Sequence, residues 1–289
     1  MTDMNRREAL ATLAAAGVGS ALSVDPVMTL GESQAPLRGR LRQSVSRWCY
    51  ERIPFDEFCR AVAGMGLTAI DLLQPEQWPI ARDHGLICSM GYGGGGTIPD
   101  ALNNPANHDR IVADLTASMP LAVAHGVPNL ITFFGSRRGM SDAEAIRHCV
   151  AGLERIKPVA EEHGITICVE LLNSKVDHED YQGDRTAFGV DVVRRVDSPR
   201  VKLLYDIYHM QIMEGDVIRT IRDTHEYIAH YHTGGVPGRH ELDDSQELNW
   251  RTICRAIAET GFTGYLAHEF VPTRDPLTSL REAVALCDV

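Results

Sequence analysis

Eight short apolar segments alternate with helical stretches from residue 41 to the end of the chain, and this alternation most constrains the fold. The candidate strands are Gln43–Trp48, Thr68–Leu73, Leu86–Met90, Pro128–Phe134, Ile165–Leu171, Val201–Asp206, Ile228–His232 and Gly264–Phe270. Several of these segments are apolar at nearly every position, as is typical of strands buried on both faces of a parallel sheet. Eight strands alternating with helices predict one closed α/β domain over residues 41–289, a single (β/α)8 TIM barrel.

Local signals support the helical stretches between these strands. Ser141 and Glu144 have the spacing of a capping box at a helix start, and Gly126 and Gly164 stand where helices are expected to end. A doubly wound open sheet is the competing topology, but no Gly-x-Gly-x-x-Gly follows the first strand, which disfavours dinucleotide binding. The glycine run at 91–96 is expected to form a flexible loop at the barrel mouth, with backbone anion binding as the alternative.

The first 35 residues have the layout of an export signal rather than of a folded element. The pair Arg6-Arg7 precedes an uncharged run rich in alanine and glycine, from Leu10 to Leu22. This run is too short for a stable membrane anchor. We therefore predict a twin-arginine signal and tether over residues 1–35 and a periplasmic location. The alternative is a cytoplasmic protein with a frayed, alanine-rich N-terminal helix.

Composition limits the partners and the redox chemistry. The formal net charge is −11, and an acidic surface repels nucleic-acid phosphates, so no nucleic-acid partner is expected. The seven cysteines include no Cys-x-x-Cys pair, and an odd count argues against a full disulfide framework. Cys88 and Cys168 lie in apolar runs and are expected to be buried small hydrophobes. The barrel faces would allow contacts between subunits of a homo-oligomer.

Potential metal ligands end the last four predicted strands. These residues are Glu170, Asp206, His232 and Glu269, and they are separated by 36, 26 and 37 residues. Such spacings correspond to about one βα unit each, and the carboxyl ends of barrel strands form the rim where barrel enzymes place their active sites. The alternative is that each is a solvated loop residue near a strand end. Four such residues in the same register favour a common site.

The ligand types indicate which metal such a site would hold. Three carboxylates and one imidazole suit a single divalent cation, with Mn²⁺, Mg²⁺, Co²⁺ and Zn²⁺ all compatible. No thiolate is among the candidates, which disfavours a structural zinc site. In addition, a carboxylate at the end of a buried strand is costly unless it is paired or bound to a metal.

Two further segments place polar side chains near this rim. His209 follows Asp206 by three residues, on the loop expected above the barrel, and Arg239 lies in a glycine-rich segment after His232. Both could fix substrate oxygens, the arginine through its forked donors. The alternatives are a capping histidine at the next helix start and a surface salt bridge. Aromatic faces pack on sugar rings, so the tryptophans are candidates to line a pocket or to pack in the core: Trp48, Trp78 and Trp250.

Two stretches carry a resemblance to a known family. The segment Tyr205–Gln211, continued by Met213–Gly215, and the segment Val236–Glu241 resemble motifs of hydroxypyruvate isomerase. That enzyme belongs to the xylose isomerase-like group of TIM barrels, which also contains ketose 3-epimerases. The resemblance covers about residues 41–289 and is strongest from residue 165 onward.

The resemblance implies roles for the candidate residues. The four strand-end residues would hold one divalent metal ion, and two of them, Glu170 and Glu269, would also act as the acid/base pair. His209, Arg239 and Asn173 would contact the substrate. At the position of His232, some hydroxypyruvate isomerases carry glutamine whereas ketose epimerases carry histidine.

The implied reaction is proton transfer beside a carbonyl through an enediolate, with a small sugar or keto acid as substrate. Isomerisation and epimerisation both remain open. The third strand lacks the histidine-containing stretch of hydroxypyruvate isomerase, and the loop Ser174–Arg185 is longer. An exported enzyme should also meet larger sugars. We therefore keep as alternatives an epimerase or β-eliminating lyase acting on keto-sugars or 3-keto-glycosides, and a non-catalytic periplasmic sugar-binding protein. The three-zinc endonucleases of related barrels fit poorly with the acidic charge and the single cluster.

Overall fold

A computed structural model describes residues 37–289, so the predicted export segment lies outside the described residues and stays a prediction. Parallel strands form two hydrogen-bonded sheets, one in the order β1-β9-β8-β7-β6-β5-β4 and one pairing β2 with β3. The strands are β1 (Arg42–Val45), β2 (Ala69–Ile70), β3 (Ile87–Cys88), β4 (Gly91–Gly95), β5 (Asn129–Phe133), β6 (Thr166–Leu171), β7 (Val201–Asp206), β8 (Ile228–His232) and β9 (Tyr265–His268).

The two sheets join into one closed barrel. Ser46, directly after β1, bridges to Asp71, directly after β2, and Leu73 bridges to Gly91 of β4. The strands β3 and β4 are consecutive pieces of one segment, so eight segments complete the ring and β9 pairs back with β1. The eight predicted strands are therefore found in order, and the (β/α)8 barrel is confirmed.

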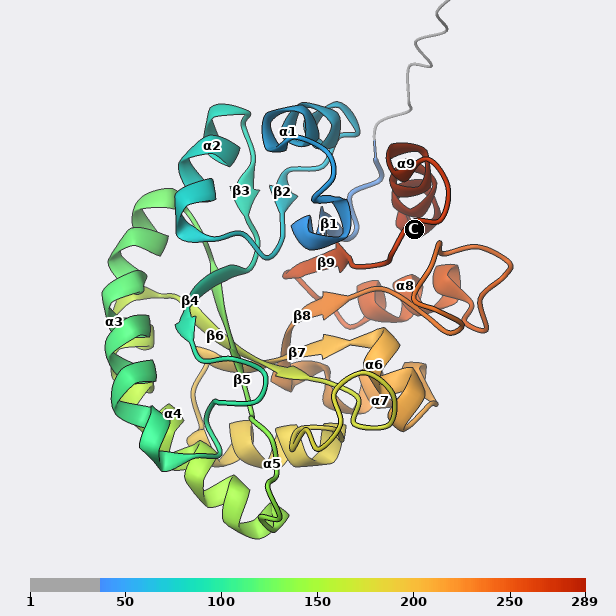
Figure 1. Cartoon of the computed structure of the whole chain (residues 1–289). Helices are drawn as coiled ribbons and strands as arrows, with labels where there is room; N and C mark the ends of the chain where they lie inside the picture. Colours follow the sequence, from blue (N-terminus) through green and yellow to red (C-terminus); the bar gives the residue numbers. More distant parts are fainter. Residues whose placement is uncertain (1–36) are drawn as a thin grey trace, which may run out of the picture. The chain divides into compact units, whose positions relative to one another are not determined.

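Helices surround the barrel, as Figure 1 shows. The long helices α3 and α4 pack side by side along one part of the ring. No described helix is long and apolar enough to cross a membrane. The α-helices are α1 (Phe55–Gly64), α2 (Trp78–Asp83), α3 (His108–His125), α4 (Asp142–His163), α5 (Thr186–Val196), α6 (Ile207–Met213), α7 (Val217–Thr224), α8 (Trp250–Glu259) and α9 (Pro276–Cys287). The 3-10 helices are η1 (Arg47–Tyr50), η2 (Pro75–Gln77), η3 (Pro105–Asn107) and η4 (His225–Tyr227).

Helix ends and cysteines follow the sequence signals. Ser141 caps α4 by accepting a hydrogen bond from the amide of Glu144, and Gly164 ends the same helix in the left-handed conformation. The cysteines are free thiols, and Cys88 and Cys168 are buried.

The glycine run after the third predicted strand is a strand rather than the expected mouth loop. Residues Gly91–Gly95 form β4, which pairs with β5. A Cβ atom added to Gly95 would lie 2.3 Å from the carbonyl oxygen of Ile131, and one added to Gly91 would lie 2.6 Å from the Trp78 ring. Glycine is therefore required here by close approach, not by flexibility.

Candidate metal centre and active site

Four side chains converge at the carboxyl end of the barrel. Glu170 lies in β6, Asp206 ends β7, His232 ends β8 and Glu269 directly follows β9. One ligand atom from each lies within 4.8 Å of the others, and all four residues are buried. The structure thus brings together every residue that the sequence predicted as a metal ligand, because parallel strands end on the same rim.

The imidazole of His232 presents one nitrogen to the three carboxylates. Its Nδ1 atom lies 3.4 Å from Oε1 of Glu170 and 3.7 Å from Oδ2 of Asp206, and Oε2 of Glu269 is closer still. In the described part of the chain, this Nδ1 makes no hydrogen bond of good geometry. A buried, unpartnered nitrogen surrounded by carboxylate oxygens is suited to share a cation with them.

The charges of the cluster also fit a bound cation. Burial raises the pKa of Glu170 to about 7, against the opposing effect of His232. Burial alone would likewise raise the pKa of Glu269, but Arg239 and His232 hold it well below its ordinary value. For His232, burial would lower the pKa, yet Glu269 and the other acids raise it well above the ordinary value. Three buried acids therefore share the positive charges of Arg239 and His232. A divalent cation would offset the remaining negative charge.

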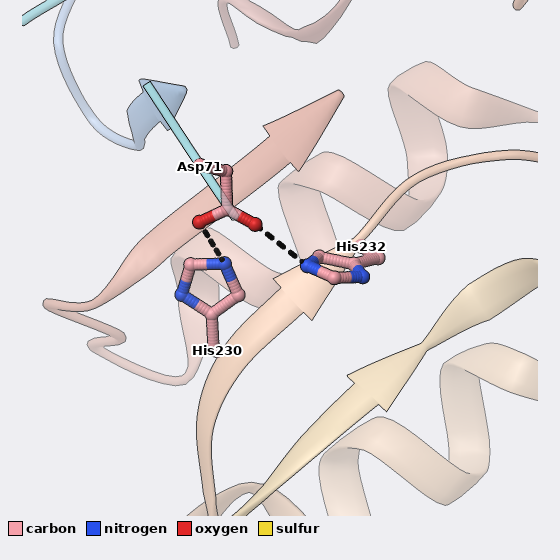
Figure 2. Close-up of side chains that lie close together, drawn as sticks. All are labelled: Asp71, His230 and His232. Carbon is pink, nitrogen blue, oxygen red and sulfur yellow. Dashed lines mark hydrogen bonds and ion pairs between the residues drawn. The ribbon is translucent and has the colours of Figure 1, made fainter. Parts of the chain in front are cut away.

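Asp71 contacts the second ring nitrogen of His232, Nε2. It was not predicted from the sequence as a site residue. Its Oδ2 atom accepts a hydrogen bond of 2.8 Å from Nε2 of His232, and its Oδ1 lies 3.1 Å from Nε2 of His230. Figure 2 shows the carboxylate lying between the two rings. Burial alone would raise the pKa of Asp71, but the two histidines hold it well below its ordinary value. Asp71 is therefore a buried anion fixed by two imidazoles.

Arg239 supplies a fixed positive charge beside the cluster. Its Nη2 atom donates hydrogen bonds of 2.5 Å to Oδ2 of Asp206 and 2.6 Å to Oε2 of Glu269. The surface salt bridge considered as an alternative is therefore wrong, since both partners are buried. The loop can approach this closely because Gly234 has a φ of 131°, and a Cβ there would lie 2.8 Å from the carbonyl oxygen of Glu269.

His209 lies within α6 and not on a loop, so that expectation is wrong. Asp206 begins this helix by accepting a hydrogen bond from the amide of His209 at 3.2 Å. Nδ1 of His209 accepts from the side-chain amide of Asn173 at 2.6 Å, which leaves Nε2 directed toward Arg239 at 3.4 Å. Burial lowers the pKa of His209 to about 4, so the ring is neutral near pH 7. Asn173 is fully buried. It contacts His209, which lines the pocket, but Asn173 is not itself among the lining residues.

A pocket of about 480 Å³ opens above the cluster. Its lining combines polar groups with aromatic and aliphatic side chains. The lining residues are Trp48, Leu72, Tyr92, Ile98, Ile131, Phe133, Glu170, Leu172, Asp177, His178, Tyr208, His209, Gly238, Arg239, Glu269 and Val271. Among these described residues, Arg239 is the one lysine or arginine, and it is already paired with two carboxylates.

The three tryptophans have different environments. Trp48 lines the pocket and is 39% exposed, whereas Trp78 and Trp250 are buried. Nε1 of Trp48 donates a hydrogen bond to Glu269, so its role goes beyond an apolar wall. Trp78 and Trp250 pack in the core.

Most of the site residues that were not predicted stand at sequence positions that could have identified them. Asp71 follows an apolar strand in the same way as the four predicted ligands do. Asp177 and His178 lie in the long loop after β6, and Tyr208 lies inside the motif around Asp206. Tyr92 carried no signal, because it stands within a glycine run that reads as a loop.

Comparison with known proteins places this geometry among related barrels. The family described as "Xylose isomerase-like TIM barrel" matches residues 59–288. A 2-oxo-tetronate isomerase of Haemophilus influenzae is 27% identical over 252 residues, which cover 80% of this chain and 93% of the relative.

Two further similarities connect the chain to other members of this group. A Danio rerio protein named "Putative hydroxypyruvate isomerase" is 31% identical over 123 residues, which cover 43% of this chain and 45% of that protein. The crystal structure of D-psicose 3-epimerase with D-tagatose from Clostridium cellulolyticum superimposes with a TM-score of 0.68 at 21% identity, covering 86% of this chain and 97% of that one. The structural match supports the fold, and the relatives by sequence are named isomerases.

Proposed function

We propose, from the premise that the chain belongs to the xylose isomerase-like TIM barrel family, that it is a divalent-metal-dependent isomerase or epimerase acting by proton transfer beside a carbonyl. The observation that carries this proposal is the convergence of four buried ligand atoms, from three carboxylates and one imidazole, within 4.8 Å. Mn²⁺, Mg²⁺, Co²⁺ and Zn²⁺ all suit this donor set.

In this proposal, Glu170, Asp206, His232 and Glu269 hold the metal ion. When bound, it would act as a Lewis acid that stabilises negative charge on neighbouring substrate oxygens. Glu170 and Glu269 are also the proton-transfer groups, because both line the pocket as well as the cluster. One carboxylate removes the proton beside the carbonyl and the other delivers one. General acid–base catalysis of this kind contributes ~10²–10⁴-fold.

Neighbouring side chains would hold these groups in place. Arg239 fixes Glu269 and Asp206, and Trp48 fixes the second oxygen of Glu269. His209 is held by Asn173 and presents Nε2 near Arg239 at the pocket wall, where it is placed to donate to a substrate oxygen. Return of the proton to the adjacent carbon gives isomerisation, as in hydroxypyruvate isomerase, and its return to the same carbon gives epimerisation.

The pocket favours a second candidate, an epimerase or β-eliminating lyase acting on keto-sugars or 3-keto-glycosides. A volume of about 480 Å³ lies in the range of ~300–1,000 Å³ typical of sites for ligands much larger than a three-carbon acid. Trp48, Tyr92 and Tyr208 offer aromatic faces. Arg239, the one arginine or lysine among the described lining residues, is already paired, which disfavours a substrate carboxylate. Export through the Arg6-Arg7 signal would give such an enzyme access to periplasmic sugars.

The test follows substrate conversion by proton NMR with Mn²⁺ present. The panel contains hydroxypyruvate, 2-oxotetronate, fructose, tagatose, xylulose and a 3-keto-glucoside. Conversion of a keto acid would support the hydroxypyruvate isomerase-like activity, and conversion of a keto-sugar would support the second candidate.

The acid/base assignment is tested with Glu170→Gln and Glu269→Gln. Each variant should lose at least ~10²-fold in turnover while its far-UV circular dichroism is unchanged. Asp109→Asn, on an exposed ion pair, is the matched control and should retain turnover. Near-normal turnover in both glutamate variants would refute the assignment. Bound sugar without any conversion would instead indicate a binding protein.

A further inference from the structure

Asp71 reaches across the barrel interior to β8 from the end of β2. It is fully buried, and its carboxylate is surrounded by donors from β8 and from the segment after β3. Nε2 of His232 donates at 2.8 Å and the hydroxyl of Ser89 donates at 2.6 Å. Nε2 of His230 lies at 3.1 Å (Figure 2). A buried carboxylate with this many donors has a fixed position.

This contact decides which nitrogen of His232 carries a proton. A carboxylate oxygen can only accept, so the hydrogen bond to Oδ2 of Asp71 places the proton on Nε2 of His232. A histidine that binds a metal does so as a neutral imidazole, and with hydrogen on Nε2 its lone pair lies on Nδ1. Nδ1 is the nitrogen that faces Glu170, Asp206 and Glu269.

We propose that Asp71 is a positioning residue that holds His232 in the Nε2–H tautomer and in the orientation that directs its Nδ1 lone pair at the metal. This inference rests on the metal site proposed above. Histidine ligands commonly donate their second ring N–H to a carboxylate, and loss of such a partner typically costs ~10–100-fold in metal affinity. Asp71 provides this partner here from a strand that supplies no ligand of its own.

The same three residues could alternatively hold a second cation, since Asp71, His230 and His232 also place ligand atoms within 4.8 Å of one another. The geometry favours the hydrogen-bonded arrangement. Each imidazole nitrogen faces a different oxygen of Asp71, at 2.8 and 3.1 Å, and Ser89 donates to one of those oxygens. A second ion would have to displace these contacts.

The experiment measures Zn²⁺ affinity and stoichiometry by chelator competition for the wild type, Asp71→Ala and Asp71→Asn. We expect one ion per chain in the wild type and a loss of ~10–100-fold in affinity for Asp71→Ala. Asp71→Asn keeps one acceptor oxygen and nearly the same shape, so its loss should be smaller. It also keeps the test decisive if the alanine variant does not fold. Gln43→Ala is the matched control, because it removes the acceptor of another buried histidine, His268, and should leave the affinity unchanged.

A second readout reports the tautomer itself. In Zn²⁺-loaded protein labelled with ¹⁵N-histidine, His232 should carry its proton on Nε2, with its signals assigned by their loss in His232→Gln. The Nε2–H signal should be lost or exchange rapidly in Asp71→Ala. Wild-type affinity in both Asp71 variants, or two Zn²⁺ ions per wild-type chain with one lost in His230→Gln, would overturn the inference. If the wild type bound no metal, the proposed metal site would fail as well.

Discussion

Nε1 of Trp48 lies 2.5 Å from Oε1 of Glu269 and donates a hydrogen bond to it. The two residues are 221 positions apart in sequence, and they meet because β1 pairs with β9 to close the barrel. Trp48 follows β1 in η1, and Glu269 follows β9. The closure of the fold therefore fixes the orientation of a carboxylate to which we assign both metal binding and proton transfer.

Trp48→Phe should keep the aromatic face and lose the donor. A hydrogen bond to a charged group is worth ~1.5–3 kcal/mol, so we expect turnover to fall ~10–100-fold. The melting temperature should change little, since Trp48 is partly exposed. Trp250→Phe is the control, because Nε1 of Trp250 has no partner among the described residues. A loss of turnover equal in both variants would contradict the assigned role of Trp48.

Arg239→Met should destabilise the protein more without a metal than with one. Removing the guanidinium leaves Asp206 and Glu269 as buried acids without their cation, and breaking a buried pair costs ~3–5 kcal/mol. Saturating Mn²⁺ should restore part of this loss. Urea unfolding with and without Mn²⁺ measures the difference.

The control for that comparison is Arg195→Met, which breaks an exposed ion pair with Asp191 and should cost less than ~1 kcal/mol. If Arg239→Met lost the same stability with and without Mn²⁺, the cation would not share the acids with Arg239.

Gly95→Ala should destabilise the barrel by at least ~1–3 kcal/mol. The added Cβ would lie 2.3 Å from the carbonyl oxygen of Ile131, a backbone atom that is held in β5. Gly64→Ala is the matched control, because an added Cβ there meets no atom within 4 Å. That helical substitution should raise stability by up to ~1 kcal/mol. Thermal unfolding separates the two, and equal effects would show that close approach does not require the glycine run.

Glu241 predicts a pH-dependent contribution to stability outside the metal centre. Its carboxylate accepts hydrogen bonds from the amides of Thr273 and Arg274 and from the hydroxyl of Ser279. Burial on its own would raise the pKa of Glu241, but its own backbone amide and these donors lower it to about 2. Because the folded pKa lies below the unfolded value, the contribution is present above about pH 4.5 and is lost as the pH falls toward 2.

Glu241→Gln should therefore reduce the free energy of unfolding by ~1–3 kcal/mol at pH 7. The gap between the variant and the wild type should narrow between pH 5 and pH 3. Urea unfolding in metal-free buffer at pH 7, 5 and 3 provides the measurement. A gap that stays constant over this range would show that ionised Glu241 is not responsible.

The barrel and the four converging residues could be predicted because their signals are local. The apolar runs mark strands buried on both faces, and an acid or histidine at each strand end marks the rim. Strand order alone then brings Glu170, Asp206, His232 and Glu269 together. Predicting that these four residues converge therefore requires no information about side-chain packing.

Contacts made across the barrel could not be predicted in the same way. Asp71 has the same strand-end position as the predicted ligands, but its two histidine partners lie on β8. The sequence does not indicate which strands face each other across the barrel interior. Arg239 was expected near the rim as a substrate contact, but its ion pairs with Asp206 and Glu269 could not be predicted, because they depend on how the loop after β8 folds back. The glycine run of β4 reads as a loop because composition does not reveal the neighbours that exclude a Cβ.

The most direct test of the central claim is metal-dependent proton exchange catalysed by the protein. Proton NMR in D₂O would follow each compound of the panel with Mn²⁺ (at concentrations low enough to limit line broadening) or Mg²⁺, and again after EDTA. We predict the loss of one proton signal beside a carbonyl in one substrate class, abolished by EDTA and restored by added metal. Exchange that continued at full rate in EDTA, or no exchange in any compound with metal shown to be bound, would contradict it.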